Sequence, residues 1–553
     1  MKHLFLLCHF FLPAILFAQT FTHADTLRGS ISPERTWWDA THYDLHVTFD
    51  YANRSLSGWN TISYKTLQPH QILQLDLMAP LILDSVVQDG KRLAWRQDGN
   101  AYFIELQQVP VAGESKKITA FYHGNPVIAQ RPPWDGGVIF AKDDKGRPWI
   151  SVACQGVGGS IWYPNKDHQY DEPDSAALHV TCPNTMTAVS NGRMRNVVVS
   201  QRNQTRTWSW ADTHPINNYN LIPNIGHYTR FSDKFAGEKG ELSLDFWVMD
   251  YNLEKAKSRF LVETPKMLKC FEHWFGAFPF YADGFKIVES PHLGMEHQTA
   301  IAYGNHFQNG YLGRDLSATG WGLKWDFILV HESGHEWFGN NISTKDIADM
   351  WVHEGFTNYS ETLYTGCEFG EEAATAYNVG CRRSISNDVP IIGTYNVNRE
   401  GSGDMYYKGG SLLHTIRQVI GDDEKFRQIL RGLNQNFALQ TVTTEQVERY
   451  VSEKAGRDFS KVFDQYLRTT QVPVLEYKLE PDKKKKGKAK LFYRWTNCVA
   501  GFDLPVKVNL PGKGWRNITP TETWQETEVF EKKGDWKFEV EKAFYVEVKQ
   551  VER

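Results

Sequence analysis

The chain has 553 residues, with 61 basic and 65 acidic side chains, a formal net charge of -4 and 41% hydrophobic residues. Because a single hydrophobic core stops growing near roughly 250–300 residues, this length predicts two or three domains. The nearly balanced charge argues against a nucleic-acid-binding protein, and the mean hydropathy of -0.48 excludes an integral membrane protein.

The first residues have the pattern of a secretory signal peptide. A short basic start, Met1-Lys2-His3, precedes the apolar run Leu4–Phe17, and polar residues resume after Ala18. This run is shorter than the roughly 20 apolar residues of a membrane-spanning helix. We therefore expect residues 1–18 to be cleaved and the mature protein to be secreted or periplasmic, without a transmembrane segment. A retained anchor, and with it surface association, is the alternative.

An antiparallel β domain is predicted for residues 19–250. Apolar and polar residues alternate along its first strand, with apolar side chains at Tyr43, Leu45, Val47, Phe49 and Tyr51. This alternation is typical of a strand with one buried face. Turn signals recur at short spacing, at Asp89-Gly90, Asp98-Gly99 and Asn191-Gly192.

Near residue 251 the periodicity becomes helical. The predicted helices cover residues 253–275, 320–340, 354–365, 409–420, 423–436 and 444–467. They indicate a mainly helical domain over residues 251–465. Alternation then returns, for example at Val506, Val508 and Leu510, so residues 466–553 are expected to form a small β domain. We interpret the lysine run Lys483–Lys486 as a solvated hairpin tip.

The cysteines give little information on their own. The chain has seven, of which Cys8 lies in the N-terminal apolar run. Cys367 and Cys381 are close enough in sequence to form a disulfide, but six cysteines allow 15 pairings, and buried free thiols fit equally well.

The pentapeptide His331-Glu332-Ser333-Gly334-His335 is the strongest functional signal. On a helix, positions i and i+4 lie on one face with Cβ atoms about 5–6 Å apart, so His331 and His335 can share one tetrahedral zinc ion. Glu332 projects beside them, where a carboxylate can take a proton from water activated by the metal. Gly334 costs the helix roughly 1 kcal/mol relative to alanine, which indicates close packing there.

Two histidines leave a zinc ion short of ligands, and Glu354 supplies the third. It begins the next predicted helix, separated from His335 by residues 336–353. Glu361 lies two turns further on the same face, where a carboxylate can orient a ligand histidine through its second ring nitrogen. The alternatives are a helix N-terminal charge for Glu354 and a solvated carboxylate for Glu361.

This arrangement of His331, His335 and Glu354 resembles the zinc signature of the gluzincin aminopeptidases, the family typified by aminopeptidase N and leukotriene hydrolase. The resemblance covers most of the mature chain. It implies an α+β multidomain fold with a saddle-like antiparallel β domain, a mainly helical thermolysin-like catalytic domain that binds one Zn²⁺ per chain, and a small C-terminal β-sandwich-like domain. Many relatives end in a large helical domain instead. The short β segment here implies a more open active site that admits longer peptides.

The segment Leu293-Gly294-Met295-Glu296-His297 resembles the family's Gly-x-Met-Glu-Asn motif. The resemblance implies that this segment binds substrate and that Glu296 holds the free α-amine, through a charge-assisted hydrogen bond that limits cleavage to the first peptide bond. Leu293 and His297 replace a glycine and an asparagine of the family, which puts the contact to the substrate backbone and the amine geometry in doubt. An ordinary edge-strand charge is the alternative for Glu296.

The segment Tyr406-Tyr407-Lys408-Gly409 resembles the family's Tyr-x-Lys-Gly. The resemblance implies that Tyr406 donates a hydrogen bond to the oxyanion of the reaction, a contact typically worth roughly 10²–10³ in rate. Because two tyrosines are adjacent, Tyr407 is the alternative holder of this role.

A third resemblance lies in the β domain, where Cys154-Gln155 precedes Trp162-Tyr163-Pro164 and Asp167. It implies that Gln155 reaches into the amine pocket, with a surface or turn glutamine as the alternative. Asp349 also follows the family pattern, either as a cap or near the metal. His353 stands where the family usually has asparagine.

The function implied is a secreted zinc-dependent aminopeptidase acting on peptides, with Glu332 as the general base. A zinc endopeptidase without a strict need for a free amine is the alternative, and acetylation of the substrate N-terminus distinguishes the two. An epoxide hydrolase of the leukotriene type is disfavoured because the helical C-terminal domain is missing. A non-catalytic glycan- or peptide-binding protein, suggested by 19 tryptophans, is the remote alternative.

Overall fold

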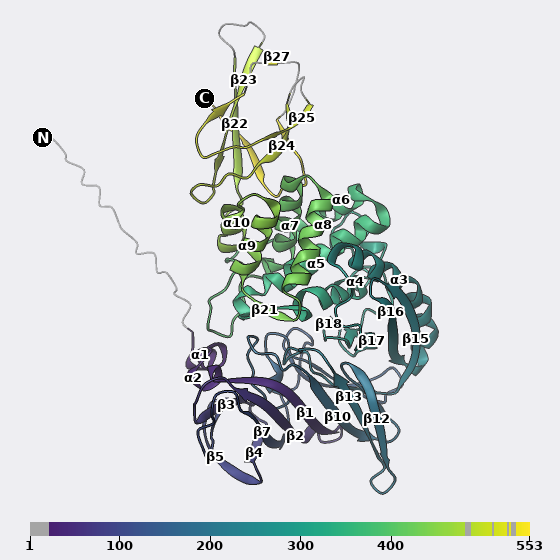
Figure 1. Cartoon of the computed structure of the whole chain (residues 1–553). Helices are drawn as coiled ribbons and strands as arrows, with labels where there is room; N and C mark the ends of the chain where they lie inside the picture. The colour runs from purple at the N-terminus through teal and green to yellow at the C-terminus, as the bar shows by residue number, and fades with distance from the viewer. Residues whose placement is uncertain (1–20, 482–487, 511–513, 528–529, 532–537, 553) are drawn as a thin grey trace, which may run out of the picture.

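The computed structural model describes residues 21–481, 488–510, 514–527, 530–531 and 538–552 (Figure 1). The expected signal peptide and the lysine run lie outside the described residues. Among those described, no helix is long and apolar enough to cross a bilayer. A β-rich part, a helical part and a second β-rich part follow one another along the chain, from purple to yellow in Figure 1. This order confirms the predicted α+β multidomain fold.

A ten-stranded sheet dominates the N-terminal part, with the order β12-β13-β10-β1-β2-β7-β4-β5-β6-β3. Along β1 (Trp38–Asp50), the predicted apolar positions from residue 43 to residue 49 are all buried. This strand pairs antiparallel with β2 (Ser55–Thr66) and parallel with β10 (Ala176–Pro183), so the predicted antiparallel domain contains one parallel pairing at its centre. The other strands are β3 (Ile72–Asp76), β4 (Ile82–Gln88), β5 (Lys91–Asp98), β6 (Ala101–Glu105), β7 (Ser115–Gly124), β12 (Arg193–Ser200) and β13 (Thr205–Asp212).

Two smaller sheets connect this part to the helices. One has the order β11-β14-β9-β8 and contains β8 (Gly137–Lys142), β9 (Pro148–Ala153), β11 (Thr187–Val189) and β14 (Asn224–Gly226). The other has the order β15-β16-β17-β19-β18 and contains β15 (Tyr228–Gly237), β16 (Gly240–Met249), β17 (Phe285–Glu289), β18 (Gly294–Met295) and β19 (Ile301–Tyr303). Because β16 pairs with β17, this sheet includes strands from both sides of the boundary expected at residue 250.

Eight α-helices form most of the described helical part. They are α3 (Leu253–Phe275), α4 (Phe327–Gly334), α5 (Trp351–Phe369), α6 (Glu371–Cys381), α7 (Tyr407–Ile420), α8 (Asp423–Asn436), α9 (Thr444–Ala455) and α10 (Ser460–Arg468). The short α1 (His23–Gly29) precedes the N-terminal sheet. The predicted bounds of α3 and α8 are confirmed. The single helix predicted for residues 444–467 is wrong, because Gly456 takes a left-handed conformation (φ 67°) that ends α9.

The helix predicted for residues 320–340 is also wrong in extent. Asp326 caps the N-terminus of α4 by accepting a hydrogen bond from the Leu329 amide at 3.3 Å, so the helix begins only at residue 327. Beyond Gly334 the chain turns through η4 (Glu336–Asn340), where Gly339 has φ 128°. A side chain at that position would be strained, and the chain leaves the helix axis there.

A disulfide joins two helices of the helical part, Cys270 of α3 to Cys367 of α5. The sequence left the pairing open; Cys381, the neighbour of Cys367 in sequence, is a buried free thiol at the end of α6. The pairing depends on how α3 packs against α5, which proximity in sequence does not reveal.

The C-terminal part is built from two small sheets, as its predicted sandwich-like character requires. They have the orders β26-β23-β22-β29 and β25-β24-β28. The shorter strands are β24 (Val506–Leu510), β25 (Gly514–Ile518), β26 (Gln525–Glu526), β28 (Glu539–Val540) and β29 (Glu547–Gln550). The longest strands are β22 (Val474–Pro481) and β23 (Lys488–Thr496). Figure 1 shows this part at the far end of the helices from the N-terminal sheet.

Candidate active site

Helices α4 and α5 bring together the three predicted metal ligands. The Nε2 atoms of His331 and His335 lie 3.8 and 3.4 Å from Oε2 of Glu354, and all three side chains are buried. Close contact of the two helices depends on Gly334, where a Cβ atom would lie 2.6 Å from Oγ of Ser360. This is the close packing that a glycine within the helix predicted.

Each histidine is held by its other ring nitrogen, so that Nε2 points to the centre of the group. Nδ1 of His331 lies 2.7 Å from Oε1 of Glu361, and Nδ1 of His335 lies 3.0 Å from the carbonyl oxygen of Phe338. The Glu361 carboxylate also accepts hydrogen bonds from Asn358 and Tyr377. Partners of this kind fix the tautomer of a ligand histidine and increase its basicity.

The donor set fits a zinc ion. Two imidazole nitrogens and one carboxylate oxygen converge, with the ligand atoms within 4.8 Å of one another. Oε2 of Glu354 is buried and has no hydrogen-bond partner among the described residues, and such an atom is costly to leave without a counter-charge. A cation bound between the three side chains satisfies it.

Glu332 lines a cavity of about 370 Å³ beside these ligands. Burial raises the pKa of its carboxyl group to about 7. Gly294 of β18 passes so close that a Cβ atom there would lie 2.7 Å from Oε1 of Glu332, and Met295 lines the same cavity. The strand β18 therefore forms the wall opposite the helix that carries Glu332.

At one end of the cavity, Glu296 is held by residues from the N-terminal part. Gln155 donates a hydrogen bond from Nε2 to Oε1 of Glu296 and another, at 3.0 Å, to Oε1 of Glu354. The hydroxyl of Tyr219 donates to the same Glu296 oxygen at 3.0 Å. Burial raises the pKa of Glu296 above its usual value. A cationic group bound here would restore the charged form of the carboxylate.

Tyr406 faces the metal ligands. Its ring stacks on the ring of His331 with centroids 6.1 Å apart. Burial, and then the neighbouring carboxylate of Glu354, raise the pKa of this phenol well above its usual value, so it remains a hydrogen-bond donor. Tyr407 also lines the cavity, and burial, followed by the charge of Glu361, raises the pKa of its phenol.

The residues that depart from the family pattern lie around the site without serving as ligands. His353 accepts a hydrogen bond from the Thr344 amide at 3.0 Å, and burial lowers its pKa to about 3. His297 is fully buried, burial lowers its pKa well below the usual value, and neither ring nitrogen has a hydrogen-bond partner among the described residues. Leu293 lines the cavity.

Asp349 links the start of α5 to other segments. Its Oδ1 accepts hydrogen bonds from Tyr395 at 2.7 Å and from Thr444 at 2.6 Å. Of the two sequence-based alternatives, capping is not observed, because the N-cap of α5 is Met350 and carries no side-chain hydrogen bond, and neither of these two partners is a metal ligand.

The residues missed by the sequence analysis include Glu400 and Trp134, which line the cavity, and Tyr219, which donates a hydrogen bond to Glu296. Burial raises the pKa of Glu400 to about 7, and its carboxylate lies against Gly156. Trp134 is 68% exposed at the rim. None belongs to a motif with regular spacing, so no signal short of the three-dimensional packing could have identified them.

The comparisons with known proteins agree with this geometry. Residues 261–466 match the model of the peptidase family M1 domain. The chain is 23% identical to leukotriene A-4 hydrolase of Xenopus laevis over 449 residues, which cover 76% of this chain and 68% of that protein. It is 23% identical to aminopeptidase N of Lactococcus lactis over 469 residues, which cover 80% of this chain and only 52% of that protein.

Solved structures show the same fold. An M1 zinc metallopeptidase from Deinococcus radiodurans, bound to a Tyr-Ser-Ala substrate, superposes with a TM-score of 0.66 at 20% identity and covers 78% of this chain and 95% of that chain. The matched family model includes all three ligands on α4 and α5 as well as Tyr406. The helical part is therefore a peptidase family M1 domain, a zinc metallopeptidase domain matched over residues 261–466.

Proposed function

We propose that this protein is an aminopeptidase that removes residues from the N-terminus of peptides, with Glu332 as the general base. The observation that carries the proposal is the position of Glu296. A carboxylate oxygen of Glu296, one of Glu332 and a ring nitrogen of His335 lie within 4.8 Å of one another. A substrate amine bound to Glu296 therefore lies beside the general base and a metal ligand. Only the first peptide bond of a substrate held in this way can reach Glu332.

His331, His335 and Glu354 would hold the Zn²⁺, which when bound acts as a Lewis acid that polarises the scissile carbonyl and lowers the pKa of water. The Glu332 carboxylate takes the proton of the attacking water and passes it to the departing amine. Tyr406 donates a hydrogen bond to the carbonyl oxygen as negative charge develops on it. Gln155 and Tyr219 keep the Glu296 carboxylate turned toward the substrate amine.

The C-terminal β part supports an open substrate entrance. It lies at the far end of the helices from the N-terminal sheet (Figure 1), whereas the cavity is lined by residues of the N-terminal and helical parts, among them Gln155 and Glu354. Among the residues that the structure describes, none that lines this cavity belongs to the C-terminal part. We therefore expect peptides of several residues to be accepted as well as dipeptides.

The proposal is tested with paired fluorogenic substrates that differ only in a free or an acetylated α-amine. Cleavage of the free-amine substrate alone, abolished by a zinc chelator and by Glu332→Gln, is the expected result. Equal cleavage of the acetylated substrate would establish the zinc endopeptidase instead. Glycan binding without hydrolysis of either substrate would favour the non-catalytic alternative.

Secretion to the periplasm or the cell exterior is a separate part of the proposal. It rests on the basic and apolar N-terminal pattern and on the disulfide between Cys270 and Cys367, because disulfides persist mainly in oxidising compartments. N-terminal sequencing of the mature protein from fractionated cells is the test. A chain that starts at Gln19 is expected, and an intact Met1 in the cytoplasmic fraction would contradict it.

A further inference from the structure

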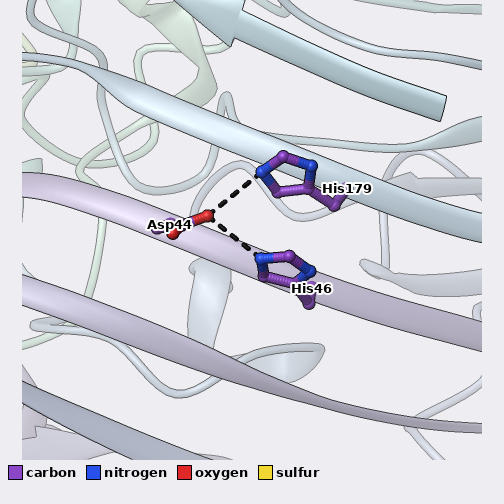
Figure 2. A group of neighbouring side chains, drawn as sticks. All are labelled: Asp44, His46 and His179. Atoms are coloured by element: carbon purple, nitrogen blue, oxygen red, sulfur yellow. Dashed lines mark ion pairs between the residues drawn. The ribbon is translucent and has the colours of Figure 1, made fainter. Parts of the chain in front are cut away.

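A second group of side chains that could bind a metal ion lies on the N-terminal sheet, apart from the residues that line the peptidase cavity. His46 of β1 and His179 of β10 are paired in register on neighbouring strands, and Asp44 lies two residues before His46. Because alternate residues of a strand share a face, all three side chains project from the same face of the sheet. Figure 2 shows both imidazoles beside one carboxylate.

The three side chains converge at distances close to those around a bound ion. Oδ1 of Asp44 lies 3.2 Å from Nε2 of His46 and 3.1 Å from Nε2 of His179. Metal–ligand bonds of about 2.0–2.2 Å in a tetrahedron place neighbouring ligand atoms about 3.3–3.5 Å apart. The ring centroids of the two histidines are 4.1 Å apart at 15°, and coordination turns the rings out of this stack toward one point.

Oδ1 of Asp44 resembles Oε2 of Glu354 in the peptidase site, because both oxygens lack a hydrogen-bond partner among the described residues. Oδ1 of Asp44 is shielded from solvent and has no partner that meets the geometry of a hydrogen bond, just as Oε2 of Glu354 has none. In both places two Nε2 atoms lie within 4 Å of the orphan oxygen. Glu354 and Asp44 therefore have the same local arrangement, in which one carboxylate oxygen faces two imidazole Nε2 atoms.

The ring of His179 is also oriented through its second nitrogen, as is usual for a histidine that binds a metal. Nδ1 of His179 lies 2.8 Å from Oγ of Ser209 on the next strand, β13. The ring of His46 is stacked on Trp59 of β2 with centroids 4.4 Å apart. The contact with Ser209 leaves Nε2 of His179 as its coordinating atom, and Nε2 of both rings lies on the side of Asp44.

The group combines one carboxylate with two imidazole rings whose centroids lie 4.1 Å apart. A divalent ion attracts all three groups at once.

We propose that Asp44, His46 and His179 form a second metal site, which binds a divalent transition-metal ion such as Zn²⁺. Imidazole and carboxylate ligands suit this class of ion. The side chains of the three residues are 42%, 30% and 25% exposed, so the ion is reached from solvent and keeps open positions for water. Binding links β1 to β10 and stabilises the N-terminal sheet, because the ion binds only the folded arrangement.

The test measures zinc per chain in the full-length protein after chelator treatment, zinc loading and dialysis. His46→Gln and His179→Gln are each expected to hold one ion fewer than the wild type, while their peptidase activity stays within twofold. The matched control is His123→Gln, because His123 pairs with Asp84 on the same sheet but has no second histidine in its group. It is expected to keep the wild-type zinc content.

Equal zinc content in the wild type, His46→Gln and His179→Gln would overturn the proposal, since any additional ion would then lie elsewhere, for example between Glu296 and Glu332. The criterion is the difference between variants, so it does not depend on the peptidase assignment. Ser209→Ala keeps the test available if a histidine variant folds poorly. It is expected to weaken zinc binding at this site about 10–100-fold without changing the zinc-dependent activity. Unchanged affinity in Ser209→Ala together with equal zinc contents would leave no second site.

Discussion

Nε2 of Gln155 lies 3.0 Å from Oε1 of Glu354, so a residue from the N-terminal part contacts a metal ligand on α5 directly. The same amide holds Glu296. One side chain thus connects the group that would bind the substrate amine with the group that would bind the metal, and its removal should affect both.

Gln155→Ala is expected to raise KM for free-amine substrates and to lower kcat, because Glu296 loses one of its two side-chain donors. A loss of about 10-fold in kcat/KM corresponds to about 1.4 kcal/mol, the size of a hydrogen bond to a charged group. Steady-state kinetics give both constants. Gln169→Ala is the matched control, since Gln169 contacts Thr344 away from the cavity, and it should behave as the wild type.

Glu332→Gln is expected to lower kcat by about 10²–10⁴ while zinc affinity at the peptidase site is nearly unchanged, because the residue moves protons but is not a ligand. Kinetics and zinc analysis of the same preparation check this. A parallel loss of zinc would show that the variant disturbs the ligands rather than proton transfer.

Tyr406→Phe should lower kcat by about 10²–10³, as removal of one oxyanion donor typically does, with little change in KM. Tyr407→Phe is the internal control, because after burial the carboxylate that contributes most to the raised pKa of Tyr407 is Glu361, whereas for Tyr406 it is Glu354. If Tyr407→Phe instead caused the larger loss, the assignment of the two adjacent tyrosines would have to be exchanged.

Glu361→Gln is expected to weaken zinc binding about 10–100-fold, because the amide cannot serve His331 as the carboxylate does. Competition with a chromogenic chelator measures the affinity. Glu368→Gln, on the same helix but paired with Lys266 outside the cavity, should retain wild-type affinity. Equal affinities in both variants would count against the orienting role of Glu361.

Cys270→Ser is expected to lower the free energy of unfolding by about 2–5 kcal/mol, because the disulfide closes a loop of 97 residues. Thermal melts with and without reductant measure the effect. Cys498→Ser is the control, since Cys498 is a half-buried free thiol, and it should melt close to the wild type. Reductant should lower the Tm of the wild type but not that of Cys270→Ser.

Residue spacing and apolar periodicity along single helices allowed part of this structure to be predicted. His331 and His335 share a helix face by spacing alone, and the bounds of α8 follow from its strong apolar periodicity. The path of the chain after α4 depends on the backbone of Gly339 in η4, which a periodicity argument does not capture. The sequence therefore predicts the ligands on each helix better than the path of the chain between them.

Contacts between distant segments were mostly beyond prediction. Tyr219 contacts Glu296 across 77 positions of the chain. Cys367 pairs with the distant Cys270 rather than with Cys381, which is nearer in sequence. The parallel pairing of β1 with β10, which creates the group around His179, likewise depends on how the intervening strands return. Gln155 was predicted only because a resemblance marked it.

The sheet shared by β16 and β17 has a consequence for how the protein can be divided. A cut at residue 250 would leave β17 with an unpaired apolar edge, since Phe285, Ile287 and Val288 are fully buried and β16 is its neighbour. A fragment beginning there should aggregate, whereas one that begins before β15, near residue 227, keeps the sheet whole. The M1 domain of this chain therefore does not fold as a separate unit cut at residue 250, because it requires the two preceding strands, β15 and β16.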